Sequence, residues 1–325
     1  MLVKETLEHR QVWIYFASVL AGGAAAAVLT GTDRLEILIN PALALMLFVT
    51  FLQVPLADIG NAFREIRFLS ALLASNFVAV PMLALLLLAL VPDDPLVRLG
   101  VLMVLLTPCI DYVITFAQLG RADARLLLAS TPLLLAVQMA LLPLYLAIIL
   151  GEEASTLVQV EPFLHAFLWL IAVPLALAAI VQAWASRSTS GRRVATGLGV
   201  LPVPATAVVL FIVVAATVPI LENSVDKALG VIPAYLAFAV LAPLIGLAIG
   251  KAFRLGPRST RAVAFSSATR NSLVVLPLAL AVPDAVPVLP AVIVTQTLVE
   301  LVSELVYVRV LPLLGRSTDP AEHTG

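Results

Sequence analysis

The stretch LLTPCIDYVITF, residues 105 to 116, decides how this chain folds. Leu, Val, Ile and Ala dominate the sequence around it, yet it holds a proline, the only cysteine of the chain (Cys109) and an aspartate (Asp111). Proline breaks helical hydrogen bonding, and a carboxylate is costly in lipid. Inside a membrane, this stretch predicts an interrupted helix with a polar site at the interruption.

The composition indicates an integral membrane protein. The 325 residues are 62% hydrophobic and 12% charged, with a mean hydropathy of +1.09, whereas a soluble domain is about a quarter charged. A net charge of −1 offers no basic surface to nucleic acid, and one cysteine excludes an internal disulfide or a CxxC site. Because no catalytic or phosphate-loop motif is present, we expect a protein that is not an enzyme and has no cofactor.

The apolar segments predict an all-α protein with ten transmembrane helices. A crossing needs roughly 20 mainly apolar residues. The segments that qualify are 12–29, 36–56, 68–91, 96–118, 125–150, 163–184, 198–221, 229–249, 258–281 and 288–313. The first resembles a signal peptide, but nine further spans favour an uncleaved helix.

The basic residues orient these spans. Fifteen of the nineteen Lys and Arg residues fall in one set of alternating connections, and three (Arg34, Arg98 and Lys227) fall in the other. By the positive-inside rule the first set is cytoplasmic, which places both termini in the cytoplasm of a bacterial-type inner membrane. The remaining basic residue, Arg270, lies inside a predicted span.

An acidic external linker at 151–162 divides the chain into a five-helix repeat at 1–150 and a second at 163–314, followed by a disordered cytoplasmic tail at 315–325. An odd number of crossings inverts the second half, as in inverted-repeat transporters. The fourth and ninth spans occupy matching positions, and each carries its polar cluster at mid-depth. We therefore predict that both are discontinuous, although a simple kink is the commoner explanation for any single proline.

Four ionisable side chains lie deep inside the predicted spans, away from the connections: Asp111, Arg270, Glu300 and Glu304. Each costs about 2.5–3.5 kcal/mol at a helix centre, so such residues face a cavity or one another. Asp111 and Arg270 are expected to pair where the broken helices cross, either binding substrate or as a structural ion pair. Glu300 has no cationic neighbour in sequence and is predicted to carry a proton. Glu304, one turn on, is a second candidate unless it reaches water or Arg309.

Cys109 has two interpretations. A lone cysteine is usually packing, but a thiol at a helix interruption is a suitable ligand for a soft metal or metalloid. Thr107, Asn271 and Ser272 would then supply hydroxyl or amide partners to the same substrate. Four further polar residues in the spans either line a cavity or bond between helices, and the sequence does not decide between these roles: Gln53, Asn76, Gln138 and Gln296.

Three runs, TPCIDYVITFAQLGRAD (107–123), ATRNSLVVLPLALA (268–281) and TQTLVEL (295–301), together resemble the arsenite-permease branch of the bile acid/arsenite transporter superfamily. The resemblance implies ten helices in two inverted five-helix repeats, forming a panel domain and a core domain. Broken helices four and nine would cross in the core. In that branch the cysteine after the helix-four proline and the helix-ten glutamate are functional, which implies roles for Cys109 and Glu300.

The sodium-coupled branch looks similar but differs at the coupling site. It carries a Glu and a Gln one turn apart in helix nine, followed by Asn, where this chain has Ser266 and Arg270 before Asn271. A guanidinium repels a sodium ion. The Ser/Asn-rich stretch after the helix-four break is replaced here by Val113 and Ile114. We therefore expect a proton gradient, not sodium, to be the energy source.

The expected function is proton-coupled efflux of arsenite, or antimonite, by alternating access. The first rival is a proton-coupled or facilitated carrier of an organic anion, with Arg270 binding the carboxylate. An enzyme that holds magnesium through Asp93 and Asp94 is disfavoured, because no second acidic motif lies on that side. The implied partners are the lipid bilayer and a small inorganic or organic solute, and the oligomeric state stays open.

Overall fold

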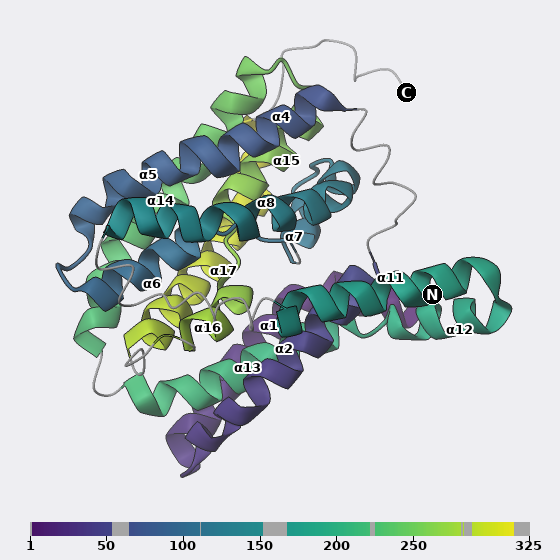
Figure 1. The fold of residues 1–325 in the computed structure, drawn as a ribbon, viewed down its shortest axis with the longest axis horizontal. Coiled ribbons are helices and arrows are strands. Elements are labelled where there is room, and N and C mark those ends of the chain that lie inside the picture. Colours follow the sequence, from purple (N-terminus) through teal and green to yellow (C-terminus); the bar gives the residue numbers. More distant parts are fainter. Residues whose placement is uncertain are drawn as a thin grey trace.

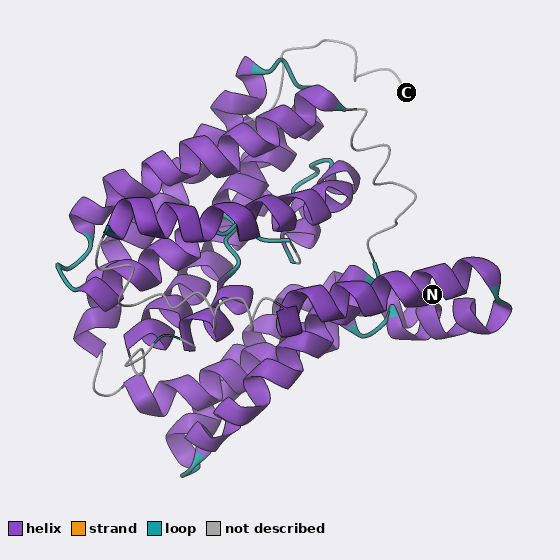
Figure 2. Ribbon diagram, viewed as in Figure 1, coloured by secondary structure: helices purple, strands orange, loops and turns teal. Residues whose placement is uncertain are grey.

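The structure, a computed structural model, describes residues 2–53, 65–110, 112–151, 168–221, 225–280, 282 and 288–314. Asp111, the predicted linker beyond Gly151 and the predicted tail at 315–325 lie outside these residues. The described chain is helical throughout, and its one bridge-type backbone pairing joins two helix interruptions. The all-α prediction is confirmed (Figure 2).

Two bundles make up the molecule (Figure 1). The panel bundle contains α1 (Leu2–Val28), α2 (Glu36–Phe51), α11 (Val173–Arg187), α12 (Thr189–Leu198) and α13 (Pro202–Leu221). Within it α13 packs against α1 and α2, and α11 packs against α2 and α12. α1 and α13 each include a stretch apolar enough to cross a bilayer, and α2 forms another together with the 3-10 helix at Thr32–Leu35 that precedes it.

The core bundle holds the remaining helices. They are α4 (Ile66–Ala74), α5 (Val80–Leu87), α6 (Pro95–Leu105), α7 (Val113–Leu119), α8 (Ala124–Leu150), α14 (Val225–Ala252), α15 (Pro257–Ala268), α16 (Ser272–Leu280) and α17 (Val288–Leu314). A π-helical turn at Ser75–Ala79 joins α4 to α5 within one span. The two bundles touch mainly through α13 against α17 and α2 against α16.

Two segments predicted to span the membrane are interrupted. The fourth segment is built as α6 and α7, and the ninth as α15 and α16. Each interruption contains the polar cluster seen in the sequence, with Pro108 and Cys109 in one and Thr269, Arg270 and Asn271 in the other. Seven helices among the described residues are long and apolar enough to cross a bilayer, against ten predicted spans. Two of the other three are these interrupted segments, and the third is the sixth predicted span, of which the structure describes the shorter apolar helix α11.

The same contacts recur 162 residues further along the chain. Tyr145 donates its hydroxyl to the carbonyl of Phe77 at 2.5 Å, and Tyr307 donates to the carbonyl of Ala239 at 2.5 Å. Pro95 and Pro257, also 162 apart, begin α6 and α15. The long helices α8 and α17 keep the same offset within two residues. These contacts and helix starts therefore recur at nearly the same spacing in the two halves of the core.

Gly22 and Gly23 give a matched test of how tightly α1 packs on α13. A Cβ at Gly22 would lie 2.7 Å from the Phe211 carbonyl oxygen, whereas a Cβ at Gly23 meets nothing within 4 Å. We expect Gly22→Ala to destabilise the protein by about 1–3 kcal/mol through overpacking. Gly23→Ala should be neutral or stabilising by up to about 1 kcal/mol. Thermal unfolding in detergent measures both, and equal midpoints would contradict this packing.

Asp94 joins the two halves at the end of the core that is poor in basic residues. Its Oδ1 caps α6 by accepting from the N–H groups of Leu96 at 3.0 Å and Val97 at 3.2 Å. Its Oδ2 lies 2.7 Å from the Nζ of Lys227 at the start of α14. Partial burial favours the neutral acid, but Lys227 and the two N–H groups outweigh it, so the pKa of Asp94 lies below its ordinary value.

This lowered pKa predicts a pH-dependent stability. The ionised form is favoured by folding, so its contribution is complete above the unfolded pKa of about 3.9 and is lost as the pH falls through the folded value. Asp94→Asn, which keeps a capping oxygen, should lower the unfolding midpoint at pH 7, and its difference from wild type should shrink in acid. Asp93→Asn is the control, because Asp93 is 88% exposed although it pairs with Arg98. A pH-independent difference would contradict the charge assignment.

Candidate functional site

The two interruptions satisfy one another's backbone. The N–H of Cys109 donates to the carbonyl of Thr269 at 3.0 Å, and the N–H of Asn271 donates to the carbonyl of Thr107 at 2.8 Å. These bonds form an antiparallel bridge between Pro108 and Arg270, which are themselves 162 residues apart. Broken backbone inside a bilayer needs such partners, since no water is available there. The predicted crossing of the two interruptions is therefore present in the structure.

Arg270 is fully buried at this crossing, and protein oxygens surround its guanidinium. Nη2 donates to Asn76 Oδ1 at 2.8 Å, to the Ser267 carbonyl at 2.8 Å and to the Ser266 carbonyl. Nη1 donates to the Leu105 carbonyl at 3.3 Å, and the ring of Phe238 lies 5.6 Å from Cζ. The charge is thus held by α4–α5, α6, α14 and α15 together. Asp111, its predicted partner, lies outside the described residues.

Asn76 reaches Arg270 because of the π-helical turn. Wide turns of this kind are frequent at functional sites, since they insert one residue and redirect its neighbours. Within this turn Ser75 Oγ lies 2.6 Å from Ser267 Oγ, and Asn76 Nδ2 donates to Ser266 Oγ at 2.9 Å. The turn therefore fixes α4 and α5 against α15 beside the guanidinium.

Glu300 ties α17 to both interruptions. Its Oε2 accepts from the peptide N–H of Arg270 at 2.6 Å and from Gln296 Nε2 at 2.6 Å, and its Oε1 accepts from the Tyr112 hydroxyl at 2.5 Å. The single proton of the Tyr112 hydroxyl is shared with the carbonyl of Arg270, which lies 3.3 Å away. Three donors suit a carboxylate, which only accepts hydrogen bonds. Glu300, which lacks a cationic neighbour in sequence, thus finds its partners across the crossing.

Glu304 does not reach water or Arg309 as the sequence allowed. It is fully buried, and its Oε1 accepts a 2.5 Å hydrogen bond from the Thr269 hydroxyl. Its Oε2 has no hydrogen-bond partner among the described residues. Both carboxyl groups of α17 therefore contact the interruption between α15 and α16.

Apart from Asp111, which lies outside the described residues, the predicted substrate ligands are buried at the crossing. Cys109, Thr107, Asn271 and Ser272 each have no exposed surface. The Thr107 hydroxyl donates to backbone carbonyls of α6, and the Ser272 hydroxyl donates to Gln296. Among the polar N and O atoms of these four side chains, only Nδ2 of Asn271 lacks a hydrogen-bond partner in the described part of the chain. In this conformation Thr107 and Ser272 have no hydroxyl proton to offer a solute.

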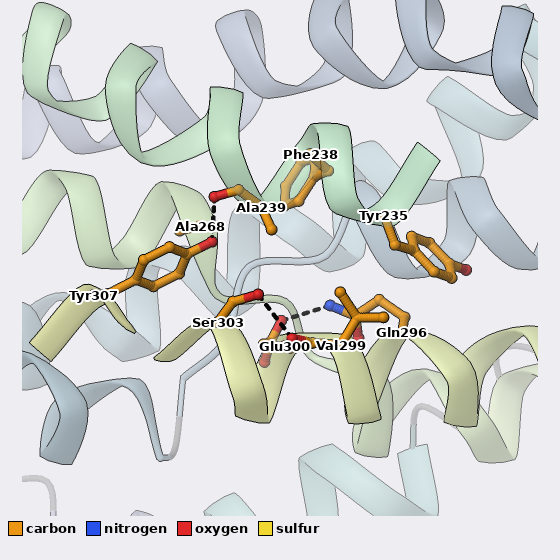
Figure 3. Close-up of a pocket in the computed structure, with 9 residues that line it drawn as sticks. All are labelled: Tyr235, Phe238, Ala239, Ala268, Gln296, Val299, Glu300, Ser303 and Tyr307. Atoms are coloured by element: carbon orange, nitrogen blue, oxygen red, sulfur yellow. Dashed lines mark hydrogen bonds between the residues drawn. The ribbon is translucent and has the colours of Figure 1, made fainter. Parts of the chain in front are cut away.

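A small cavity lies beside Glu300 between α14 and α17, and its volume of about 10 Å³ is room for about one water molecule. Gln296, Glu300, Ser303 and Tyr307 follow one another along α17 on one side of it, and Tyr235, Phe238 and Ala239 face them from α14 (Figure 3). The hydroxyl of Tyr307 closes one end by donating to Ala239. Glu300, a predicted site residue, thus lines a cavity.

A much larger cleft separates the bundles at the arginine-rich end. Its empty volume is about 2090 Å³, part of it open to solvent. The wall of the panel bundle includes Lys4, Gln11 and Gln53, and the wall of the core bundle includes Thr115 and Gln118 of α7. Gln53, which the sequence left undecided, therefore lines a cavity. Because α7 begins four residues after Cys109, the cleft leads toward the crossing.

Sequence reasoning missed Tyr112 and did not assign Asn76 and Gln296. Tyr112 lies next to Asp111 in the stretch quoted at the start of the sequence analysis. Its position deep in an apolar span is the feature that could have marked it as a site residue. Gln296 shares a face of α17 with Glu300 at a four-residue spacing, which also indicates contact. Their partners lie far away in sequence, so no local pattern could name them.

The comparisons with known proteins agree with this geometry. A family model described as the Sodium Bile acid symporter family matches residues 40–227. The chain belongs to this family. It is therefore a multi-pass membrane transporter of the bile acid:sodium symporter type, which acts on a small molecule in a lipid bilayer and is not expected to be an enzyme. No curated protein matches the chain. The matched residues of the chain include Cys109 but end before Arg270 and Glu300.

Tyr112→Phe tests whether Glu300 depends on its donors. Losing a buried hydrogen bond to a charged group should reduce stability by about 1.5–3 kcal/mol. Tyr145→Phe is the matched control, because it removes a hydroxyl bound to a neutral backbone carbonyl and should cost about 0.5–1.5 kcal/mol. The measurement is the thermal unfolding midpoint of each variant, compared with that of the wild type. A loss no larger in Tyr112→Phe than in the control would show that Glu300 is not held as a carboxylate.

Proposed function

We propose that the chain is a secondary active transporter that exports trivalent arsenic, as arsenite or antimonite, in exchange for protons. It would have ten spans in two inverted five-helix repeats, with both termini in the cytoplasm of a bacterial-type inner membrane. The observation that carries the proposal is the position of Cys109. The only sulfur nucleophile of the chain sits in the break of one crossing helix, hydrogen-bonded through its backbone to the break of the other.

The 162-residue recurrence supports the inverted repeat. The bridge pairs Pro108 with its own equivalent, Arg270, in antiparallel fashion, as a twofold relation through the crossing requires. The seven continuous candidate spans, the two interrupted segments and the shorter apolar helix α11 add up to the ten spans of the proposal. Arginine-rich connections gather at the end where the cleft opens, so this conformation would face the cytoplasm.

Cys109 supports the metalloid substrate through its chemistry. A thiolate is the preferred protein ligand for soft ions, and a single one permits release where three would trap the solute. The thiol is buried in the conformation seen here, so arsenite would reach it from the cleft only when α7 moves relative to the panel bundle. Rocking of one bundle against the other provides such a movement in transporters of this architecture.

Glu300 supports proton coupling through its contacts. As a carboxylate it accepts from both the Arg270 peptide and the Tyr112 hydroxyl, which locks α17 to the crossing. A proton converts one of its oxygens into a donor, so one of these contacts is lost. We propose that this loss shifts the balance between inward-open and outward-open states, because the proton then binds the two states unequally. Glu304, bound to Thr269, would serve as the second proton site.

The Arg270 guanidinium supports independence from sodium. Four oxygen atoms from side chain and backbone accept hydrogen bonds from it, and it fills that space with a fixed positive charge. A sodium ion would need the same kind of oxygen ligands and would meet repulsion there. The family name refers to sodium, whereas we propose that this member is driven by protons.

An organic anion is the second candidate substrate. The width of the cleft and the basic residues at this end, Lys4 in the large cleft and Arg125 and Arg258 in the pocket beside it, favour it. Both terminal nitrogens of the buried Arg270 guanidinium already donate to protein oxygens, and only its Nε lacks a partner among the described residues, which counts against its predicted role as the carboxylate ligand. The two substrates are distinguished by Cys109, which only arsenite requires.

Uptake into everted membrane vesicles tests the function. We expect wild-type vesicles to accumulate arsenite when their interior is acidified, with no effect of sodium. Cys109→Ser should abolish this uptake, because a hydroxyl does not replace a thiolate toward a soft metalloid. Cys109→Ala controls for packing and should also be inactive while remaining folded. Full arsenite uptake by Cys109→Ser would refute the ligand assignment, and uptake of an organic anion by both variants would favour the second candidate.

A further inference from the structure

Gln138 lies at the middle of α8 and is 1% exposed. Neither its Nε2 nor its Oε1 has a hydrogen-bond partner in the part of the chain that the structure describes. A buried amide without partners costs about 1–3 kcal/mol per group, so such a residue requires an explanation. An apolar residue at this place would fold at least as well.

The repeat explains why Gln138 has no partner among the described residues. Gln138 is 162 residues before Glu300, so the two residues occupy equivalent places on equivalent helices. Glu300 is held by three donors: the Arg270 peptide N–H, the Tyr112 hydroxyl and the Gln296 amide. The three equivalent positions in the other half are Pro108, Val274 and Leu134. Proline has no N–H, and valine and leucine have no polar side-chain atom, so every donor is missing.

This equivalence also locates Gln138 relative to the crossing. Glu300 accepts a hydrogen bond from the peptide of Arg270 at the bridge. Since Pro108 is the equivalent of Arg270, we infer that Gln138 on α8 lies beside Pro108. In agreement with this, α8 packs against α6, α7 and α15, which form the crossing. The bridge puts Asn271 next to Thr107 and Pro108. The Nδ2 of Asn271 is the other buried amide group at the crossing that lacks a partner in the described chain.

We propose that Gln138 and Asn271 form a hydrogen-bonding subsite for a neutral, hydroxylated solute, next to Cys109. The inference rests on the proposed function and assigns how arsenous acid, which carries three hydroxyl groups and no charge at neutral pH, is recognised apart from its sulfur contact. A carboxamide offers one donor group and one acceptor. A cation would leave Nε2 unsatisfied and an anion would leave Oε1 unsatisfied, whereas a hydroxyl group both donates and accepts.

The subsite makes a distinctive prediction for Gln138→Leu. Without ligand, this variant should unfold at the same temperature as wild type or higher, because it removes two unsatisfied polar groups. Its affinity for arsenite, measured by calorimetry on the purified full-length protein, should fall by about tenfold or more. Gln182→Leu is the matched control. It removes hydrogen bonds from Gln182 to the carbonyls of Phe51 and Leu52 in the panel bundle, so it should lose stability but retain affinity.

Leu134→Gln provides a second test that leaves Gln138 in place. The new amide stands four residues before Gln138, as Gln296 stands before Glu300, and should bond to it. Leu134→Gln should therefore weaken arsenite binding about as much as Gln138→Leu does, because the amide of Gln138 would then be bonded to the new side chain and unavailable to the solute.

The outcomes separate this inference from the proposed function. Arsenite binding by wild type with unchanged binding by Gln138→Leu and Leu134→Gln would overturn the subsite and leave the function intact. A marked loss of stability in ligand-free Gln138→Leu would also overturn it, because Gln138 would then have a structural partner. If wild type binds no arsenite at all, the proposed substrate is refuted, and the ligand assigned to Gln138 falls with it.

Discussion

The antiparallel bridge between the two helix interruptions is the contact on which the rest of the structure depends. Breaking a helix within a bilayer frees peptide groups that lipid cannot satisfy. Here the N–H groups of Cys109 and Asn271 each find a carbonyl in the opposite break. Neither break would be stable without the other, so the crossing forms as a unit. The side chains of Cys109, Arg270 and Asn271 are placed together as a consequence.

The two buried charges at the crossing have different freedom. Arg270 is held by oxygens from several helices and keeps its charge in place. Glu300 contacts the Arg270 peptide and a hydroxyl from α7, so its bonding depends on how α7 is positioned. In the proposed mechanism, the fixed charge of Arg270 would take the place of an ion from solution. The carboxyl group of Glu300 would then be the group whose bonding changes during a transport cycle, by gaining and losing a proton.

Much of this site could be predicted from sequence, because proline, arginine and glutamate stand out in an apolar background. The interruption at Pro108, the depth of Arg270 and the depth of Glu300 were visible in that way. The partners were not, since Tyr112 is 188 residues from Glu300 and Asn76 is 194 from Arg270. The π-helical turn that aims Asn76 departs from the helical period that sequence reading assumes. The short helix α12 is polar, so hydropathy could not reveal it.

The two halves share a backbone plan but differ in side-chain chemistry at their equivalent centres. In one half an acid on α17 is satisfied by three donors, and in the other an amide on α8 has none among the described residues. If the two halves carried the same side chains at these centres, both centres would make the same hydrogen bonds. A solute would then bind neither centre in preference to the other. Under the proposed function, this asymmetry would assign one centre to a proton and leave the other available to a neutral molecule. Because both centres would adjoin the same bridge, a change in the bonding of one would then alter the position of the other, which is the physical requirement for coupling the two fluxes.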